Sequence, residues 1–208
     1  MNIIAVSQRV DIIRQPNGAV ERRDALDQAW PTFLAAAGCL CVPVPNNLEL
    51  AQAILRELPI DGLLLTGGND LVAYGGDAPE RDAVQSDMLR LARDWKMPVL
   101  GVCGGMQAIQ EAFGVPLERV EGHVADAQTI EIEGAPVIVN SFHHWGARAS
   151  SDALDVWARA PDGVVKAIRH RAEPIMGVMW HPERIQPFAR ADLSRFRVFF
   201  SERLGDED

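Results

Sequence analysis

The sequence predicts an α/β fold: a mostly parallel central sheet with helices on both faces and an antiparallel extension. Two observations support this fold class. In the first half, short continuous apolar runs alternate with segments of helical periodicity, the order that builds parallel sheets. In the second half, strand-like runs follow one another with turns such as Glu133-Gly134 between them, which is typical of antiparallel pairing.

In the first half, apolar runs without polar alternation indicate strands that are covered on both faces. They lie at residues 3–7, 40–43, 62–66 and 98–102. Apolar residues spaced three and four apart predict helices between them, over 23–37, 48–58 and 81–95. Gly38 follows the first predicted helix, where a C-terminal glycine is common.

In the second half, five further strands are expected, at 129–132, 136–139, 154–160, 164–168 and 175–179. A helix over 191–204 closes the fold, and 205–208 is expected to be a frayed acidic tail. We find no repeats or linkers, so residues 1–208 are expected to form a single domain.

Composition narrows the function classes. The formal net charge of the 208 residues is −9, which disfavours nucleic-acid binding because phosphate contacts need a basic face. No apolar run approaches the roughly 20 residues that span a bilayer. The three cysteines form no CxxC pair and no disulfide framework. We therefore expect a reduced, cytoplasmic protein that binds neither nucleic acid nor membrane.

The most informative motif is GVCGGMQ at 101–107, where a predicted buried strand runs directly into Cys103 and a helical segment follows. The pattern G-x-C-x-G matches the nucleophile elbow, a strained strand-to-helix turn that requires small neighbours. The positive end of the helix favours the thiolate, and the backbone N–H of Gly104 would face an oxyanion. The alternative interpretation is a buried apolar cysteine at a strand end.

Two other strand ends carry compatible groups. LTGGND at 65–70 places paired glycines after a strand. Such a loop can supply a second oxyanion donor, although a plain turn has the same pattern. WHPE at 180–183 ends another apolar strand. Glu183 can reach one nitrogen of His181 while the other nitrogen faces the thiol, which is the arrangement of a nucleophile, base and orienting acid.

The stretch VNSFHH at 139–144 places polar groups after an apolar strand. It can line a pocket or form a turn with capping groups, and the sequence favours neither. Cys39 and Cys41 share one face of a predicted strand and are expected to be core residues.

At these motifs the chain resembles the class I glutamine amidotransferase superfamily, over residues 62–184. TGGND, GVCGGMQ, NSFH and WHPE look like the γ-glutamyl hydrolase branch of that superfamily. A finer likeness is to hydrolases of γ-glutamyl-CDP-amidate in capsular phosphoramidate biosynthesis, carried by RDALD at 23–27 and Arg184. The sequence departs from its relatives in having Gly104 where they often carry arginine. It also keeps only His123 of a G-H-x-x-x-H-x-V stretch.

The resemblance implies a flavodoxin-like sheet and a cysteine amidohydrolase without cofactor or metal. It assigns Cys103 as nucleophile, His181 as base and acid, and Glu183 as orienting group, with a γ-glutamyl thioester on Cys103. The oxyanion and substrate contacts it implies are Gly68, Gly104, Asn69, Gln107, Asn140, Ser141, His143 and Arg184. Homodimers are common in this superfamily.

The expected partner is therefore a small γ-glutamyl amide. A CDP-amidate is expected to bind through cationic side chains, since they pair with its phosphates. The candidates are Arg9, Arg14, Arg22, Arg23 and Arg184. The alternatives are γ-glutamyl-γ-aminobutyrate or another γ-glutamyl amine, a glutaminase subunit that serves a separate synthase chain, and a non-catalytic binding protein.

Overall fold

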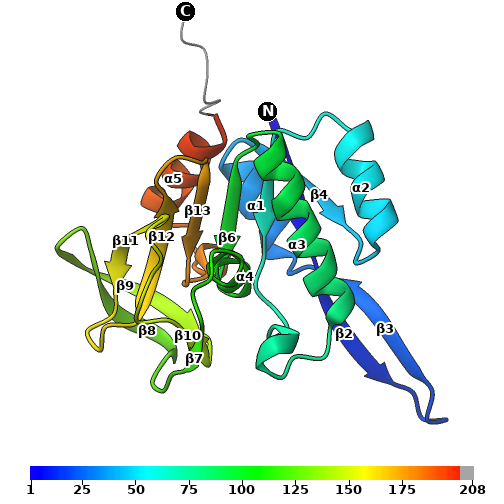
Figure 1. Cartoon of the computed structure of the whole chain (residues 1–208), viewed down its shortest axis with the longest axis horizontal. Helices are drawn as coiled ribbons and strands as arrows, with labels where there is room; N and C mark the ends of the chain where they lie inside the picture. The colour runs from blue at the N-terminus through cyan, green and yellow to red at the C-terminus, as the bar shows by residue number, and fades with distance from the viewer. Residues whose placement is uncertain (202–208) are drawn as a thin grey trace, which may run out of the picture.

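A nine-stranded sheet runs through the computed structural model, which describes residues 1–201 of the chain (Figure 1). Within these residues the strand order is β4-β1-β5-β6-β13-β12-β11-β8-β9. The first five strands in this order are mutually parallel. Their bounds are β1 (Asn2–Ser7), β4 (Cys39–Val44), β5 (Gly62–Leu65), β6 (Val99–Val102) and β13 (Ile175–Val178). This is the flavodoxin-like order, and the predicted fold class is confirmed.

The parallel strands are in register at the edge where the chain leaves them. Leu65 of β5 lies beside Gly101 of β6, and Val102 of β6 lies beside Val178 of β13. Because the carboxyl ends of these three neighbouring strands are level, the segments that follow them meet at one edge. In open α/β sheets, ligands bind at this edge.

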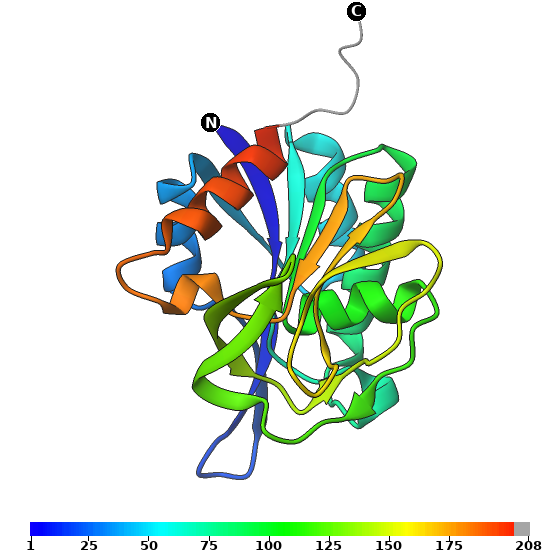
Figure 2. The same cartoon turned by 90° about the vertical axis from the view of Figure 1, so that its left-hand side faces the viewer.

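Helices cover both faces of the sheet (Figure 2). On one face lie α1 (Ala29–Ala36) and α5 (Arg190–Ser201), which share a cluster of buried side chains. On the other face lie α2 (Leu48–Glu57), α3 (Pro79–Asp94) and α4 (Gly104–Ala112). Two 3-10 turns, η1 (Val72–Tyr74) and η2 (Pro182–Arg184), complete the helical segments among residues 1–201.

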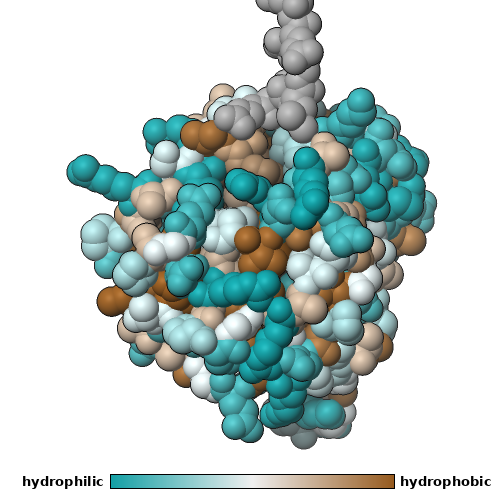
Figure 3. Space-filling view, turned by 60° about the vertical axis from the view of Figure 1, so that its left-hand side comes forward, coloured by the Kyte–Doolittle hydropathy of each residue, from teal (hydrophilic) through white to brown (hydrophobic). Residues whose placement is uncertain are grey.

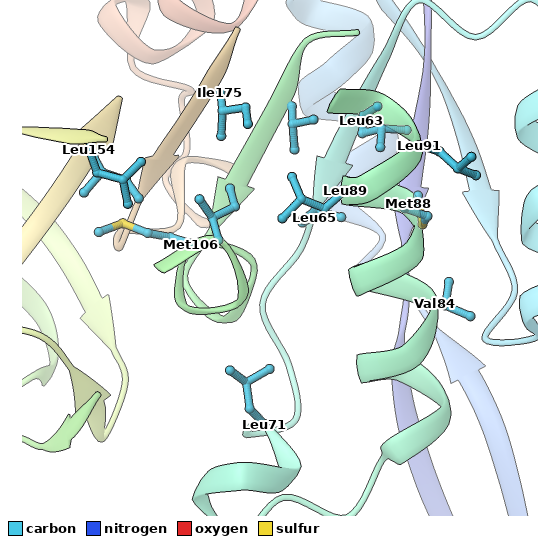
Figure 4. Packing of buried hydrophobic residues seen from close by; sticks show 14 of the residues in the cluster. Leu63, Leu65, Leu71, Val84, Met88, Leu89, Leu91, Met106, Leu154 and Ile175 are labelled. Carbon is cyan, nitrogen blue, oxygen red and sulfur yellow. The ribbon is translucent and has the colours of Figure 1, made fainter. Parts of the chain in front are cut away.

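The larger core cluster lies between the sheet and helices α3 and α4 (Figure 4). Leu63 and Leu65 of β5 point toward Met88 and Leu89 of α3, and Met106 of α4 joins them. Each of these side chains is at most 3% exposed. Full burial of one such side chain contributes about 1.5–3 kcal/mol, so this packing fixes α4, and hence its N-terminus, against the sheet.

The antiparallel extension consists of β12, β11, β8 and β9, which follow β13 across the sheet. A tight turn at Glu133 and Gly134, both with positive φ, joins β8 to β9, as the sequence predicts. Figure 3 views the molecule with this side turned forward, and most of the surface there is hydrophilic with smaller hydrophobic areas. The bounds are β8 (Val124–Ile132), β9 (Ala135–Phe142), β11 (Leu154–Arg159) and β12 (Val165–His170), with a separate pair β7 (Glu118–Arg119) and β10 (Trp145–Gly146).

The helix predicted over 23–37 is wrong in its first part. A hairpin of β2 (Arg9–Arg14) and β3 (Val20–Ala25) projects from the body instead (Figure 1), and the helix begins only at Ala29. Pairing of β3 with β2 provides backbone hydrogen bonds that compete with the helical pattern. The Asp27 carboxylate then accepts a hydrogen bond from the Ala29 amide at 3.0 Å and starts α1.

The last predicted helix, over 191–204, corresponds to α5 for the residues that the structure describes, and 202–208 lie outside them. Within residues 1–201, no helix is both long and apolar enough to cross a membrane.

Candidate active site

Cys103 occupies the turn between β6 and α4 with φ 51° and ψ −108°. A non-glycine residue in this region is strained, and the predicted elbow conformation is confirmed. Gly101 and Gly105, two residues before and after Cys103, have no room for a side chain. A Cβ on Gly105 would lie 1.9 Å from the Leu65 carbonyl oxygen, and a Cβ on Gly101 would lie 2.7 Å from the Gly105 backbone. The small residues of the motif therefore allow α4 to pack directly on β5 and β6.

Backbone contacts hold Cys103 beside the end of β13. Its amide donates a hydrogen bond to the Val178 carbonyl oxygen at 2.8 Å, and its Sγ lies 3.8 Å from the Phe142 carbonyl oxygen. The side chain is only 6% exposed. The elbow is thus fixed by the parallel sheet on one side and by β9 on the other.

His181 reaches the same place from the neighbouring strand, three residues after the end of β13. Its Nδ1 donates a hydrogen bond to Glu183 Oε1 at 2.7 Å, and its ring lies close enough to Cys103 for interaction with the thiol to raise its pKa. Both His181 and Glu183 are buried. The three residues that the sequence singled out are therefore brought together.

The charges of this group favour a protonated imidazole. Burial lowers the pKa of His181, but hydrogen bonds with Cys103 and Glu183 outweigh that effect and raise it to about 9. Glu183 is 1% exposed and its Oε2 has no hydrogen-bond partner among the described residues. The cations beside Glu183 Oε1 are the imidazole, at 2.7 Å, and the Arg184 guanidinium, at 3.4 Å.

The loop after β5, residues 66–70, lies against the same group, and we call it the glycine loop. A Cβ on Gly67 would lie 3.2 Å from Cys103 Cβ and 3.0 Å from His181 Cε1. A Cβ on Gly104 would lie 3.6 Å from the Gly68 amide nitrogen. The Gly68 amide thus lies beside Gly104, the residue that follows the thiol, and both amides are candidates for oxyanion donors.

A cavity of about 330 Å³ opens over the thiol. Two of its cationic residues, Arg9 and Arg184, were expected near the substrate. Arg9 pairs with Asp11 at 2.9 Å, and the Arg184 guanidinium lies 5.3 Å from the centre of the Phe142 ring. The lining residues are Arg9, Val10, Asp11, Gly68, Asn69, Cys103, Phe142, His181 and Arg184.

The other three arginines considered for an anion do not line this cavity. Arg22 pairs with Glu80 at 2.6 Å and Arg23 with Glu21 at 2.7 Å. Arg14 is the exposed last residue of β2. Their surroundings are those of surface arginines on the hairpin.

Most of the remaining predicted contacts are engaged within the protein. Asn69 lines the cavity, but its side chain bonds the Val10 backbone in both directions. Gln107 donates to the Trp145 carbonyl oxygen at 2.8 Å. Asn140 bonds the backbone of His181. These side chains hold the walls of the site.

Ser141 and His143 belong to a buried network that the sequence did not indicate. Lys166 of β12 donates to Ser141 Oγ at 2.9 Å and to His143 Nε2 at 2.8 Å, and His143 Nδ1 donates to the Trp145 carbonyl oxygen. Burial and the Lys166 cation lower the pKa of His143 to about 3. His123, which stacks on His143, is held by Asp162 and Gln128. Both histidine rings therefore have their nitrogens occupied inside the protein.

Two buried cations, Arg81 and Lys166, were missed although each left a signal in the sequence. Arg81 is three and seven residues before Val84 and Met88, which puts it on the buried face of α3. Lys166 interrupts the apolar run 164–168. A charged residue within an apolar stripe indicates a buried charge, and both are 0% exposed.

A larger cavity, of about 590 Å³, lies at the opposite end of the parallel strands. Its charged residues already pair with one another, for example Arg93 with Glu173 at 2.7 Å, and neither a cysteine nor a histidine is among its lining residues. Residues 1–201 also contain no group of three or more His, Cys, Asp or Glu side chains that could hold a metal ion.

Comparisons with known proteins point to one family. The family model described as "Glutamine amidotransferase class-I" matches residues 24–196. The γ-glutamyl-CDP-amidate hydrolase of Campylobacter jejuni is 30% identical over 144 residues, which cover 68% of this chain and 71% of that protein. The γ-glutamyl-γ-aminobutyrate hydrolase PuuD of Escherichia coli is 28% identical over 198 residues, covering 76% and 78%.

The fold is also similar to a solved structure. A protein from Thermoplasma acidophilum, described as a putative GMP synthase subunit, superposes with a TM-score of 0.72. The match covers 97% of this chain and 93% of that one, at 18% sequence identity.

Proposed function

Because the chain belongs to the class-I glutamine amidotransferase family, we propose that it is a hydrolase that cleaves a γ-glutamyl amide and releases L-glutamate. One observation carries the proposal. Cys103 sits at a strained elbow beside His181, which in turn donates to the buried Glu183. A nucleophile, a base and an orienting acid in series are the parts that covalent amide hydrolysis needs.

In the first half-reaction, the Cys103 thiolate attacks the δ-carbonyl carbon of the γ-glutamyl group. The carbonyl oxygen becomes an oxyanion between the backbone amides of Gly68 and Gly104. Protonated His181 gives its proton to the amide nitrogen, the C–N bond breaks, and the amine leaves. The product on the enzyme is a γ-glutamyl thioester of Cys103.

In the second half-reaction, His181 accepts a proton from water as the water oxygen attacks the thioester carbon. The C–S bond breaks, glutamate leaves, and the thiolate and imidazolium are restored. Glu183 keeps the proton on Nδ1 of His181, so that Nε2 faces the sulfur in both steps. The pKa of His181, raised to about 9, supports an imidazolium that is ready to protonate the leaving nitrogen at neutral pH.

For the leaving group, we propose a phosphorylated amine such as the CDP-amidate, which would give cytidine diphosphoramidate for phosphoramidate modification of a capsular polysaccharide in the cytoplasm. Arg9 and Arg184 at the cavity support it, because a diphosphate offers acceptors for two guanidinium groups. A leaving group with one carboxylate, as in γ-glutamyl-γ-aminobutyrate, is the second candidate. A glutaminase subunit with a separate synthase and a non-catalytic binding protein remain as alternatives.

The test measures glutamate release from γ-glutamyl-CDP-amidate, γ-glutamyl-γ-aminobutyrate and glutamine, with Cys103→Ala and Cys41→Ala in parallel. Cys41 is the matched control because its thiol is distant from the cavity, and burial raises its pKa to about 11. We expect release from the CDP-amidate that is lost only in Cys103→Ala. Release mainly from the aminobutyrate conjugate would support the hydrolase mechanism and contradict the proposed CDP-amidate leaving group. A protein that releases glutamate from none of them, with a Cys103 inert to iodoacetamide, contradicts the hydrolase proposal.

A further inference from the structure

Arg81, in the first turn of α3, is a buried cation whose hydrogen bonds go to the glycine loop. Its Nη1 donates to the Asn69 carbonyl oxygen at 2.7 Å, and its Nη2 donates to the Thr66 carbonyl oxygen at 2.7 Å. These two carbonyls lie on either side of the dipeptide Gly67-Gly68. One guanidinium therefore ties together both ends of the loop that carries the Gly68 amide.

Burying the Arg81 guanidinium is costly, and Arg81 forms no ion pair with an acidic side chain within residues 1–201 that would offset this cost. Arg81 is 0% exposed, and its Nε has no hydrogen-bond partner among the described residues. Burial lowers the pKa of Arg81 to about 10, although nearby Asp82, Cys103 and Asp70 act in the other direction. A neutral or apolar residue would fill the same space at lower cost, so packing alone does not account for a guanidinium here.

The guanidinium also lies next to the elbow that carries the thiol. A Cβ on Gly104, the residue after Cys103, would lie 3.6 Å from Arg81 Nη2 and 3.5 Å from Gly67 Cα. The elbow, the glycine loop and Arg81 thus pack together on one side of the nucleophile. Arg81 does not itself line the cavity, so it acts through the loop residues that do, such as Asn69, and through its charge.

The peptide between Gly67 and Gly68 needs such a restraint. Glycine imposes little preference on its own dihedrals, and Gly68 has φ 145°, a conformation that other residues avoid. A peptide between two glycines can rotate and turn its N–H away from the thiol. The Thr66 carbonyl directly before this peptide and the Asn69 carbonyl beyond Gly68 are each held 2.7 Å from one rigid, planar group, so that rotation is opposed from both sides.

We propose that Arg81 is a positioning residue that holds the Gly68 amide toward Cys103, so that the oxyanion finds its donor already in place. The inference rests on the proposed hydrolase function. It also adds a requirement, because the two loop carbonyls must both be held. A single positive charge near the thiol is not sufficient.

The experiment compares Arg81→Lys and Arg81→Met with the wild-type protein. A single lysine nitrogen keeps the charge but cannot occupy both Nη positions, and methionine removes charge and donors together. Arg90→Met is the control, since Arg90 is on the same helix but pairs with Asp87 and Asp94 at the surface. All are assayed below their unfolding temperatures, and Arg81→Lys keeps the test usable if Arg81→Met fails to fold.

Three readouts separate positioning from a general structural role. The first is kcat for glutamate release, and the second is the affinity for an aldehyde analogue of the γ-glutamyl group, which forms an oxyanion-bearing adduct with Cys103. The third is the rate of alkylation by iodoacetamide, which forms no oxyanion. For Arg81→Lys we expect kcat and aldehyde affinity to fall together by about 10²-fold, the usual effect of losing one oxyanion donor. The alkylation rate and KM should stay close to wild type.

Wild-type kcat and aldehyde affinity in Arg81→Lys would overturn the inference, because charge alone would then suffice. Equal loss of all three readouts would also overturn it and indicate a structural role. If the wild type cleaves no γ-glutamyl amide, the proposed function fails. The aldehyde still tests the inference in that case. Weaker aldehyde binding to Arg81→Lys than to wild type supports the inference. Equal binding to the two proteins, or no binding to either, contradicts it.

Discussion

The side chain of Asn140 holds the backbone of His181 through both of its functional groups. Asn140 Nδ2 donates to the His181 carbonyl oxygen at 2.8 Å, and Asn140 Oδ1 accepts from the His181 amide at 2.7 Å. The two residues are far apart in sequence, one in the antiparallel extension and the other after a parallel strand. This contact is how the antiparallel half of the sheet positions the proposed base.

Removing this contact should lower kcat, whereas a substitution elsewhere with a similar loss of stability should not. Asn140→Ala leaves the buried amide of His181 unpaired, whereas the carbonyl oxygen still accepts from the Arg184 amide at 3.2 Å. The unpaired amide costs about 1–3 kcal/mol, and the backbone of His181 is freed to move. We expect a lower free energy of unfolding in urea and a lower kcat. Asn47→Ala is the control: Asn47 caps α2 by accepting from the Leu50 amide, so this variant should lose about 1 kcal/mol and keep its kcat. If both variants keep full activity, Asn140 does not position His181.

Glu183→Gln tests the orienting role of Glu183. The carboxylate raises the pKa of His181 and fixes its proton on Nδ1. We therefore expect kcat to fall by about 10³–10⁴-fold, as for the corresponding change in a serine triad. The pKa of His181, followed by NMR of its ring, should fall below the wild-type value of about 9. Glu173→Gln, at the other end of the parallel strands, should change neither quantity, and a His181 pKa equal in all three proteins would contradict the assignment.

Two glycines beside the thiol should respond differently to alanine. In Gly67→Ala the new methyl would lie 3.0 Å from His181 Cε1 and 3.2 Å from Cys103 Cβ. We expect the pair to be pushed apart and kcat to fall by about 10²-fold, the order of magnitude for a misplaced group. In Gly104→Ala the closest contacts are 3.5 and 3.6 Å, so activity should be retained. The opposite ranking of the two variants would show that the space around the thiol is not as described.

Lys166 should make stability depend on pH. Burial lowers its pKa to about 8 from an ordinary 10.5, so the folded state binds this proton less tightly than the unfolded state. The cost of burying the charge is then about 3 kcal/mol at pH 7. It diminishes as pH rises from about 8 to 10.5, because the folded protein loses the proton first.

Lys166→Met removes this cost together with two hydrogen bonds. The free energy of unfolding of the variant minus that of wild type should therefore be larger at pH 7 than at pH 10, by about 2 kcal/mol. Urea unfolding of both proteins at the two pH values measures it, and other titrating groups cancel in the difference. A difference that does not change with pH would mean that the pKa of Lys166 is not lowered in the folded protein relative to the unfolded protein.

Much of the architecture was predictable because it depends on local pattern. The apolar runs at β1, β5 and β6 identify strands covered on both faces. The same expectation is wrong for β4, an edge strand that exposes Leu40. β13, expected within the antiparallel extension, is instead parallel to β6. The β2–β3 hairpin was not predictable in the same way. The RDALD stretch has helical spacing, yet its first residues pair with β2, and pairing partners distant in sequence are not visible in local periodicity.

The residues proposed for catalysis were also visible in the sequence, because their positions at strand ends follow from the chemistry. Cys103 needs small neighbours at an elbow, and His181 and Glu183 alternate after a strand, so the motifs are local. Their supports are not local. Arg81 spans the glycine loop from another element, Asn140 bonds His181 across 41 residues, and Lys166 bonds Ser141 across 25.

The sequence by itself therefore determined the alternation of strands and helices outside the β2–β3 hairpin, and the chemical groups at the ends of β5, β6 and β13. The tertiary structure alone decided which buried polar groups satisfy one another, and so which side chains are free to face the cavity. The reason is physical. Backbone preference and apolar periodicity act over a few residues, whereas a buried charge or amide must find its partner wherever the folded chain places one.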